Sequence, residues 1–300
     1  MKGDRISAVY NGLTEDKKNK NKKESENLLA LFVALLKDIG NRESRERLLG
    51  EMMALRAQYA IGHAVDGFKM DIDEAIQLLK NTKDDTLTKV EIEKRDRLIA
   101  AVDNLVEFSV CQEYHMYKDL LEYDPDIYDG DIDFNDEESI APYYNICNKY
   151  NDTYASVENG DIEYAMGIAY QWLWCSPTTY LTYMTQNDDR VRPWHYALQG
   201  FTARRDDFPS WMIPPIEWGC RCFLMAESGE IIADKDRIKD VKASFEVPEK
   251  PSQLDNVFAE SVAKCGRIFG KAHPYFKVAK ADKDKLKEYV DDIRKQYYAE

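Results

Sequence analysis

Residues 86–122, TLTKVEIEKRDRLIAAVDNLVEFSVCQEYHMYKDLLE, contain neither glycine nor proline. Their apolar side chains recur at steps of three and four residues, which is the spacing of one buried helix face: Val90, Leu98, Val102, Leu105, Val106 and Val110. We therefore predict one long helix here. Charge pairs such as Glu91 with Arg95 are expected to support its exposed face.

The segments before this helix show the same helical spacing. Residues 27–39 and 43–65 each carry one apolar stripe, and Gly40-Asn41 between them is a stop signal. Asp71 or Asp73 can cap a short third helix. We therefore predict that the N-terminal half of the chain is helical.

The first 27 residues are polar and include a short basic run: Lys17, Lys18, Lys20, Lys22 and Lys23. The simpler interpretation is a solvated, frayed helix start. The alternative is an arm that contacts an anionic partner.

Residues 122–138 hold nine carboxylates and no lysine or arginine. Asp129, Asp131 and Asp133 have the alternation of a calcium loop, but an EF-hand loop requires glycine at its sixth position and glutamate at its twelfth. A loop from Asp129 has Phe134 and Ile140 there, and a loop from Asp131 fails in the same way. We therefore predict a solvated acidic linker.

The second half of the chain mixes helices with a few strands. We expect helices over 141–156 and 161–174, because Asn159-Gly160 between them is a turn signal. The later elements are predicted in chain order: a strand at Thr178–Thr185, a hairpin of Phe223–Ala226 with Ile231-Ile232, and a last helix at Lys280–Tyr298.

These patterns predict an α+β fold, with a mostly helical N-terminal half followed by a small α+β module with few short strands. The expected organisation has four parts: a helical region at 1–121, the acidic linker at 122–140, the α+β module at 141–278 and the C-terminal helix at 279–300.

Composition excludes several function classes. The formal net charge is −14, so the chain should have no strong general affinity for nucleic acid. No apolar run approaches the roughly 20 residues of a membrane span, and the N-terminus lacks a secretory pattern. We therefore expect a cytoplasmic protein whose six cysteines stay reduced.

The most informative motif lies between Tyr183 and Met225. It begins YMTQNDDRVRPWHYALQG at 183–200 and ends PPIEWGCRCFLM at 214–225. Its characteristic residues occur in a fixed order within about forty positions: Thr185, Asp188 or Asp189, Arg190, Arg192, His195, Leu198, Gly200, Pro214, Pro215, Gly219, Cys220, Arg221 and Cys222.

This ordered set resembles the core signature of the phage Mu protein F-like minor head proteins. The segment NVFAESVAKCGRIFGKAHPYFKV at 256–278 is also similar to the tail of family members from gut-bacterial prophages. The resemblance implies a phage or prophage minor head protein that acts in head morphogenesis. Its implied partners are portal and capsid proteins, with a possible link to DNA packaging or ejection, and its implied locations are the bacterial cytoplasm during assembly and the virion head.

The same residues have a direct physical interpretation. Gly200 and Gly219 can adopt positive φ at sharp reversals, and Pro214-Pro215 stiffens the approach to the last strand. Asp189, Arg190 and Arg192 can tie one loop to another through charge-assisted hydrogen bonds.

His195, Cys220 and Cys222 form the one plausible metal set, because zinc accepts imidazole and thiolate. A structural zinc site requires four ligands, and the candidates for the fourth are Asp188, Asp189, Cys265 and His273. The alternative is that no cofactor binds, His195 hydrogen-bonds locally and the cysteines pack as small apolar groups.

A catalytic role for these residues is the less favoured hypothesis. The alternative function is a phage-associated toxin-like enzyme, a nuclease or an ADP-ribosyltransferase, that uses the His195 region. Relatives of the module are sometimes fused to such toxins, but the 226–300 stretch holds one histidine and no paired acid–base set. We therefore expect no enzyme. The five tryptophans, all within 172–218, are expected to build the core of the module rather than a partner surface.

Overall fold

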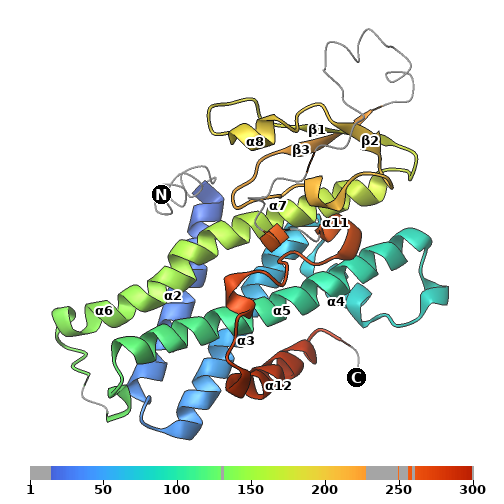
Figure 1. Ribbon diagram of the computed structural model, residues 1–300. Coiled ribbons are helices and arrows are strands. Elements are labelled where there is room, and N and C mark those ends of the chain that lie inside the picture. The colour runs from blue at the N-terminus through green and yellow to red at the C-terminus, as the bar shows by residue number, and fades with distance from the viewer. Residues whose placement is uncertain (1–14, 130–131, 228–248, 250–255, 259–260, 299–300) are drawn as a thin grey trace.

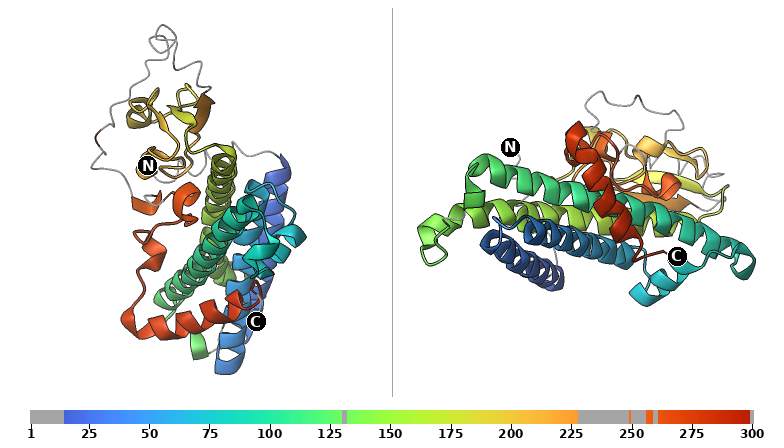
Figure 2. Two further views of the ribbon diagram at one scale, coloured as in Figure 1. Left: turned by 90° about the vertical axis from the view of Figure 1, so that its right-hand side faces the viewer. Right: turned by 90° about the horizontal axis from the view of Figure 1, so that it is seen from below.

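The computed structural model describes residues 15–129, 132–227, 249, 256–258 and 261–298. Long helices form one layer, and a small antiparallel sheet lies on one side of it (Figures 1 and 2). The predicted α+β class is confirmed: helices dominate the N-terminal half, and the described strands lie in the C-terminal part. Within the described residues, no helix is long and apolar enough to cross a membrane.

The described N-terminal half consists of α2 (Glu15–Lys37), α3 (Arg42–Gly67), α4 (Ile72–Lys80) and α5 (Lys89–Tyr123). Asn41, Asp71 and Thr88 cap the last three helices by accepting backbone N–H groups. The predicted pair of Glu91 with Arg95 is wrong. Glu91 instead completes a capping box with Thr88, while Arg95 lies 2.6 Å from Asp84.

A continuous helical rod follows, made of α6 (Glu137–Asn148), a π-helical turn (Lys149–Tyr154) and α7 (Ala155–Trp174). The predicted turn at Asn159-Gly160 is wrong. Asn159 is buried inside α7, where its side chain accepts a hydrogen bond from Arg56 and donates one to Asn21. These tertiary contacts override the local turn preference of the dipeptide.

The basic run is not a simple solvated end, so that prediction is wrong in part. α2 already begins at Glu15. Lys17 Nζ lies 2.7 Å from Glu163 on α7, and Lys20 Nζ lies 2.6 Å from Asp66 on α3. The two lysines therefore attach the start of α2 to its neighbouring helices.

The acidic segment connects α5 to α6. It contains a short 3₁₀ turn, Ile127–Asp129, whose isoleucine is buried. Asp131, which belonged to the rejected calcium motif, lies outside the described residues.

The sheet has the order β2-β1-β3, and both pairings are antiparallel. The predicted strand at 178–185 is confirmed as β1 (Tyr180–Met184), which lies between β2 (Thr202–Arg204) and β3 (Phe223–Glu227). The predicted hairpin partner of β3 at Ile231-Ile232 lies outside the described residues.

The C-terminal segment returns to the helical layer through α11 (Val262–Cys265), a 3₁₀ turn (Pro274–Phe276) and α12 (Lys283–Arg294). The last helix is thus shorter than the predicted Lys280–Tyr298: residues 280–282 form a 3₁₀ turn, and the α-helix ends at Arg294. The side chain of Asn104 on α5 anchors this segment: its oxygen accepts the N–H groups of Ile268 and Phe269 at 2.8 and 2.7 Å.

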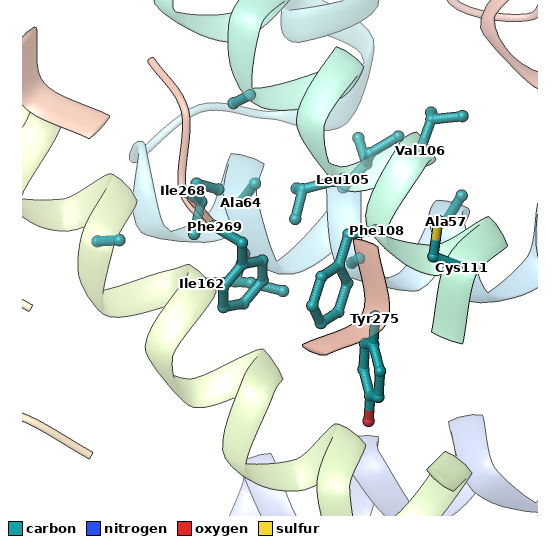
Figure 3. Packing of buried hydrophobic residues seen from close by; sticks show 14 of the residues in the cluster. Ala57, Ala64, Leu105, Val106, Phe108, Cys111, Ile162, Ile268, Phe269 and Tyr275 are labelled. Carbon is teal, nitrogen blue, oxygen red and sulfur yellow. The ribbon is translucent and has the colours of Figure 1, made fainter. Parts of the chain in front are cut away.

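The core is shared by segments from both halves of the sequence (Figure 3). Phe108 of α5 stacks on Phe269, with 4.1 Å between ring centroids, and Ile162 of α7 and Tyr275 belong to the same buried cluster. The acidic segment therefore does not separate two independent cores among the described residues.

Candidate functional site: a histidine–cysteine cluster

The sequence motif forms two loops beside β1. The first loop runs from Thr185 to the short helix α8 (Pro193–Tyr196). The chain then reverses at Gly200, whose N–H donates to the carbonyl of Tyr183 at 2.9 Å. Gly200 and Gly219 have φ values of 88° and 63°, which are the left-handed conformations predicted for them. The second loop contains Pro215, which follows a cis peptide bond, and leads into β3.

His195, Cys220 and Cys222 come together where these loops meet. The Nδ1 atom of His195 lies 3.8 Å from Cys220 Sγ and 3.4 Å from Cys222 Sγ. The three ligand-type atoms all lie within 4.8 Å of one another. The three residues are 1%, 3% and 3% exposed, respectively, so the cluster is closed to bulk solvent.

The other ring nitrogen of His195 is held by a carboxylate. Nε2 lies 3.1 Å from Glu217 Oε2, and Arg192 Nε lies 2.8 Å from the same oxygen. Arg192 also donates to the carbonyl of Trp218, so it ties the first loop to the second. Glu217 was not predicted, because its role depends on how the two loops pack.

A second connection between the two loops lies nearer the surface. It involves Asp188, whereas Asp189 was predicted. Arg221 donates to both carboxylate oxygens of Asp188, at 2.7 and 2.8 Å. Arg190 Nε lies 3.8 Å from the same carboxylate. Asp189 is exposed and makes no such contact with the described residues, so Asp188 has the role that was predicted for its neighbour.

The surroundings shift proton affinities within the cluster. A hydrogen bond with Cys220 lowers the pKa of the Cys222 thiol, while burial raises the pKa of Cys220. Burial on its own lowers the pKa of His195, but hydrogen bonds with Cys220 and Glu217 outweigh it and raise the pKa. Cys222 is therefore the thiol that ionises more readily.

Helix α7 supplies further polar groups that sequence reasoning missed. Asp161 accepts the N–H of Gly219 with both carboxylate oxygens, at 3.0 and 2.9 Å. Tyr164 donates to the carbonyl of Cys222 at 2.6 Å. These two bonds fix the backbone on both sides of Cys220. The sequence signal available for Asp161 was a polar residue within the apolar pattern of a helix. That signal does not show which group the residue bonds to.

The predicted candidates for a fourth metal ligand do not join the cluster. Asp188 pairs with Arg221, and Asp189 points to solvent. His273 lies among aromatic rings, and its Nδ1 accepts the N–H of Tyr275; burial lowers the pKa of this histidine to about 3. Cys265 is exposed and donates to the carbonyl of Ser261.

Cys222, His195 and Glu217 also have the order of a nucleophile, a base and an orienting carboxylate. A nucleophile must contact its substrate, however, and both Cys222 and His195 are almost fully buried. The arrangement is therefore better suited to holding the two loops together than to attacking a substrate.

The tryptophans lie mainly on the core side of the module. Trp172 is buried, and Trp194, Trp211 and Trp218 are half-buried against the core. Trp174 is the exception, because it is 60% exposed at the end of α7.

The fold and the site together define a small α+β module, backed by a long helix, whose loops are tied by buried polar groups. Residues 174–225 match the family described as Phage Mu protein F like protein. The resemblance indicated by the motif residues is thus confirmed, and this part of the chain is similar to the Mu F-like family.

A relative with a similar sequence is the Mu-like prophage FluMu F protein of Haemophilus influenzae. It is 35% identical over 86 residues, which are 28% of this chain and 20% of that protein. The chain therefore spans only a fifth of this relative. No solved structure gives a significant match.

Proposed function

We propose that the chain is a minor head protein of a tailed phage or prophage, which acts in head morphogenesis through contacts with portal and capsid proteins. The observation that carries the proposal is the Mu F-like match over residues 174–225, which coincides with the tied module around His195. The relative is named for a Mu-like prophage, which supports a phage origin.

Physical features support a role in binding rather than catalysis. The histidine–cysteine cluster is buried, so it stabilises the shape of the module. The negative net charge suits a protein that shares a capsid with DNA without adhering to it. The toxin-like alternative, with nuclease or ADP-ribosyltransferase activity at His195, would require a substrate to reach a side chain that is only 1% exposed.

Deletion of the gene in the phage or inducible prophage that encodes it tests this proposal. We expect the particles to contain this chain by mass spectrometry and the deletion to lower the yield of normal heads in electron micrographs. Wild-type chain and the Cys265→Ser variant should both restore the yield, because Cys265 lies outside the cluster.

A chain that is absent from purified heads and whose deletion leaves head yield unchanged would refute the assembly role. Co-expression with the portal protein of the same phage tests the partner. We expect the two proteins to co-purify, and failure to do so at low salt would refute a direct portal contact.

A further inference from the structure

The cluster around His195 contains three metal-ligating groups of two types, one imidazole and two thiols. An imidazole nitrogen and two thiol sulfurs converge from α8 and from the segment before β3. Arg192 and Arg221 lie nearby, but each is already bonded to a carboxylate, Glu217 and Asp188 respectively. The interior of the cluster is thus lined by groups that bind soft or borderline metal ions.

The distances between the histidine nitrogen and the two sulfurs are compatible with a tetrahedral zinc ion. Zinc lies about 2.3 Å from thiolate sulfur and about 2.0 Å from imidazole nitrogen, so tetrahedral ligands are separated by about 3.6 Å. The distances from His195 Nδ1 to Cys222 and Cys220 Sγ are 3.4 and 3.8 Å. These two nitrogen–sulfur distances need to change by only a few tenths of an ångström for an ion to bind.

The hydrogen bonding of His195 leaves the correct nitrogen free for a metal. Glu217 accepts the proton on Nε2, which leaves the lone pair of Nδ1 directed toward the sulfurs. Arg192 holds Glu217 in place. A carboxylate behind the histidine is the usual outer-shell partner of a zinc-binding imidazole, because it fixes the tautomer and raises its basicity.

A buried hydroxyl beside the thiols provides independent support. Tyr183 is fully buried, and its hydroxyl lacks a hydrogen-bond partner of good geometry within the described residues. The thiols of Cys220 and Cys222 are among the groups that interact electrostatically with this hydroxyl. A neutral thiol is a weak acceptor, whereas a metal-bound thiolate is a good one, so metal binding satisfies this buried donor.

We propose that His195 Nδ1, Cys220 Sγ and Cys222 Sγ bind one zinc ion, with a water molecule as the fourth ligand. Among the described residues no other histidine, cysteine or carboxylate joins the three. The ion adds a cross-link between α8 and the second loop, just before β3, and its two positive charges balance the two thiolates. This site does not depend on the proposed role in head assembly.

Metal analysis of the full chain, purified and loaded with zinc sulfate and then desalted, tests the proposal. We expect about one equivalent of zinc in the wild type, and competition with a zinc chelator should show a loss of at least tenfold in affinity for Cys220→Ser and for Cys222→Ser. Cys265→Ser and Cys175→Ser are matched controls that should retain the metal, because both residues lie outside the cluster. Circular dichroism of each variant establishes whether it is folded.

Cobalt substitution of the wild type gives a readout that does not depend on any variant. We expect near-ultraviolet absorption from thiolate-to-cobalt charge transfer and visible bands typical of tetrahedral coordination. A folded wild type that binds less than about half an equivalent of zinc, or a cobalt spectrum without thiolate bands, would overturn the proposal. Equal zinc loss from Cys265→Ser would overturn the ligand assignment as well.

Discussion

At the scale of single residues, Glu113 on α5 is an unusual ionisable group outside the cluster. It is fully buried, and Asn151 donates to its Oε2 at 3.4 Å. Its other oxygen has no hydrogen-bond partner among the described residues. Burial raises the pKa of Glu113 to about 7, although Asn151 and the charge of Arg56 oppose this shift. The carboxyl is therefore protonated in the folded chain over a range where it is ionised in the unfolded chain.

This difference predicts a pH dependence of stability. The stabilising effect of the proton is fully present below the unfolded pKa of 4.5 and is lost as pH rises through about 7. Replacement of Glu113 by glutamine removes the charge, so Glu113→Gln should stabilise the chain at pH 8 by up to about 3 kcal/mol.

Urea unfolding at pH 8 and pH 4 measures the effect. The gain in stability from Glu113→Gln should largely disappear at pH 4, because the Glu113 carboxyl is then mostly protonated in both the folded and the unfolded chain. Glu93→Gln, at an exposed position of the same helix, is the control and should have little effect at either pH. Equal effects of the two substitutions would contradict the assignment.

Sequence reasoning identified part of the candidate site. His195, Cys220 and Cys222 could be assigned to one module because they belong to a motif whose residues occur in a fixed order. Such a motif can be recognised without knowledge of the contacts. Glu217 and Asp161 could not be identified in this way, because each acts on a residue that is more than twenty positions away. Asp188 and Asp189 are equivalent in sequence, and only the path of an irregular loop separates their roles.

At the scale of elements, the close crossing of α3 and α7 depends on Gly67. A Cβ atom at this position would lie 2.1 Å from the backbone carbonyl oxygen of Glu163 on α7. Gly62, five residues earlier on α3, has no atom within 4 Å of the corresponding point. The two glycines thus have the same chemistry in opposite surroundings.

We predict opposite effects of alanine at these two positions. Gly67→Ala should force the helices apart and destabilise the chain by about 1–3 kcal/mol, because the clash involves backbone rather than a flexible side chain. Gly62→Ala should stabilise it by up to about 1 kcal/mol through helix propensity. Denaturation midpoints of the two variants test this, and similar midpoints would show that α3 and α7 do not cross as closely as described.

The long helices could be predicted from sequence because their periodicity is local. The errors arose where distant contacts outweigh local preference. Asn159-Gly160 has the composition of a turn, but Asn159 is buried against Arg56, so the helix continues through both residues. β2 spans only Thr202–Arg204 and was not located, because three residues carry too little periodicity.

At the scale of the whole molecule, α7 belongs to both the helical layer and the small α+β module around His195. Asp161 and Tyr164 on this helix bond to the backbone around Cys220. Ile162, between them, is buried in the core cluster with Phe108 and Phe269. If α7 unfolded, buried surface would be exposed in both the helical layer and the α+β module. The two parts should therefore unfold together.

The distribution of tryptophan makes this last prediction measurable. All five tryptophans lie within residues 172–218, whereas most described helices lie outside that range, so fluorescence reports on the module and far-ultraviolet circular dichroism on the helical layer. We expect the two signals to give one coincident urea transition. Gly67→Ala should lower both midpoints by the same amount, because its clash lies at the helix that both parts share. If the fluorescence transition occurred at a lower urea concentration while the helical signal persisted, α7 would not couple the two parts.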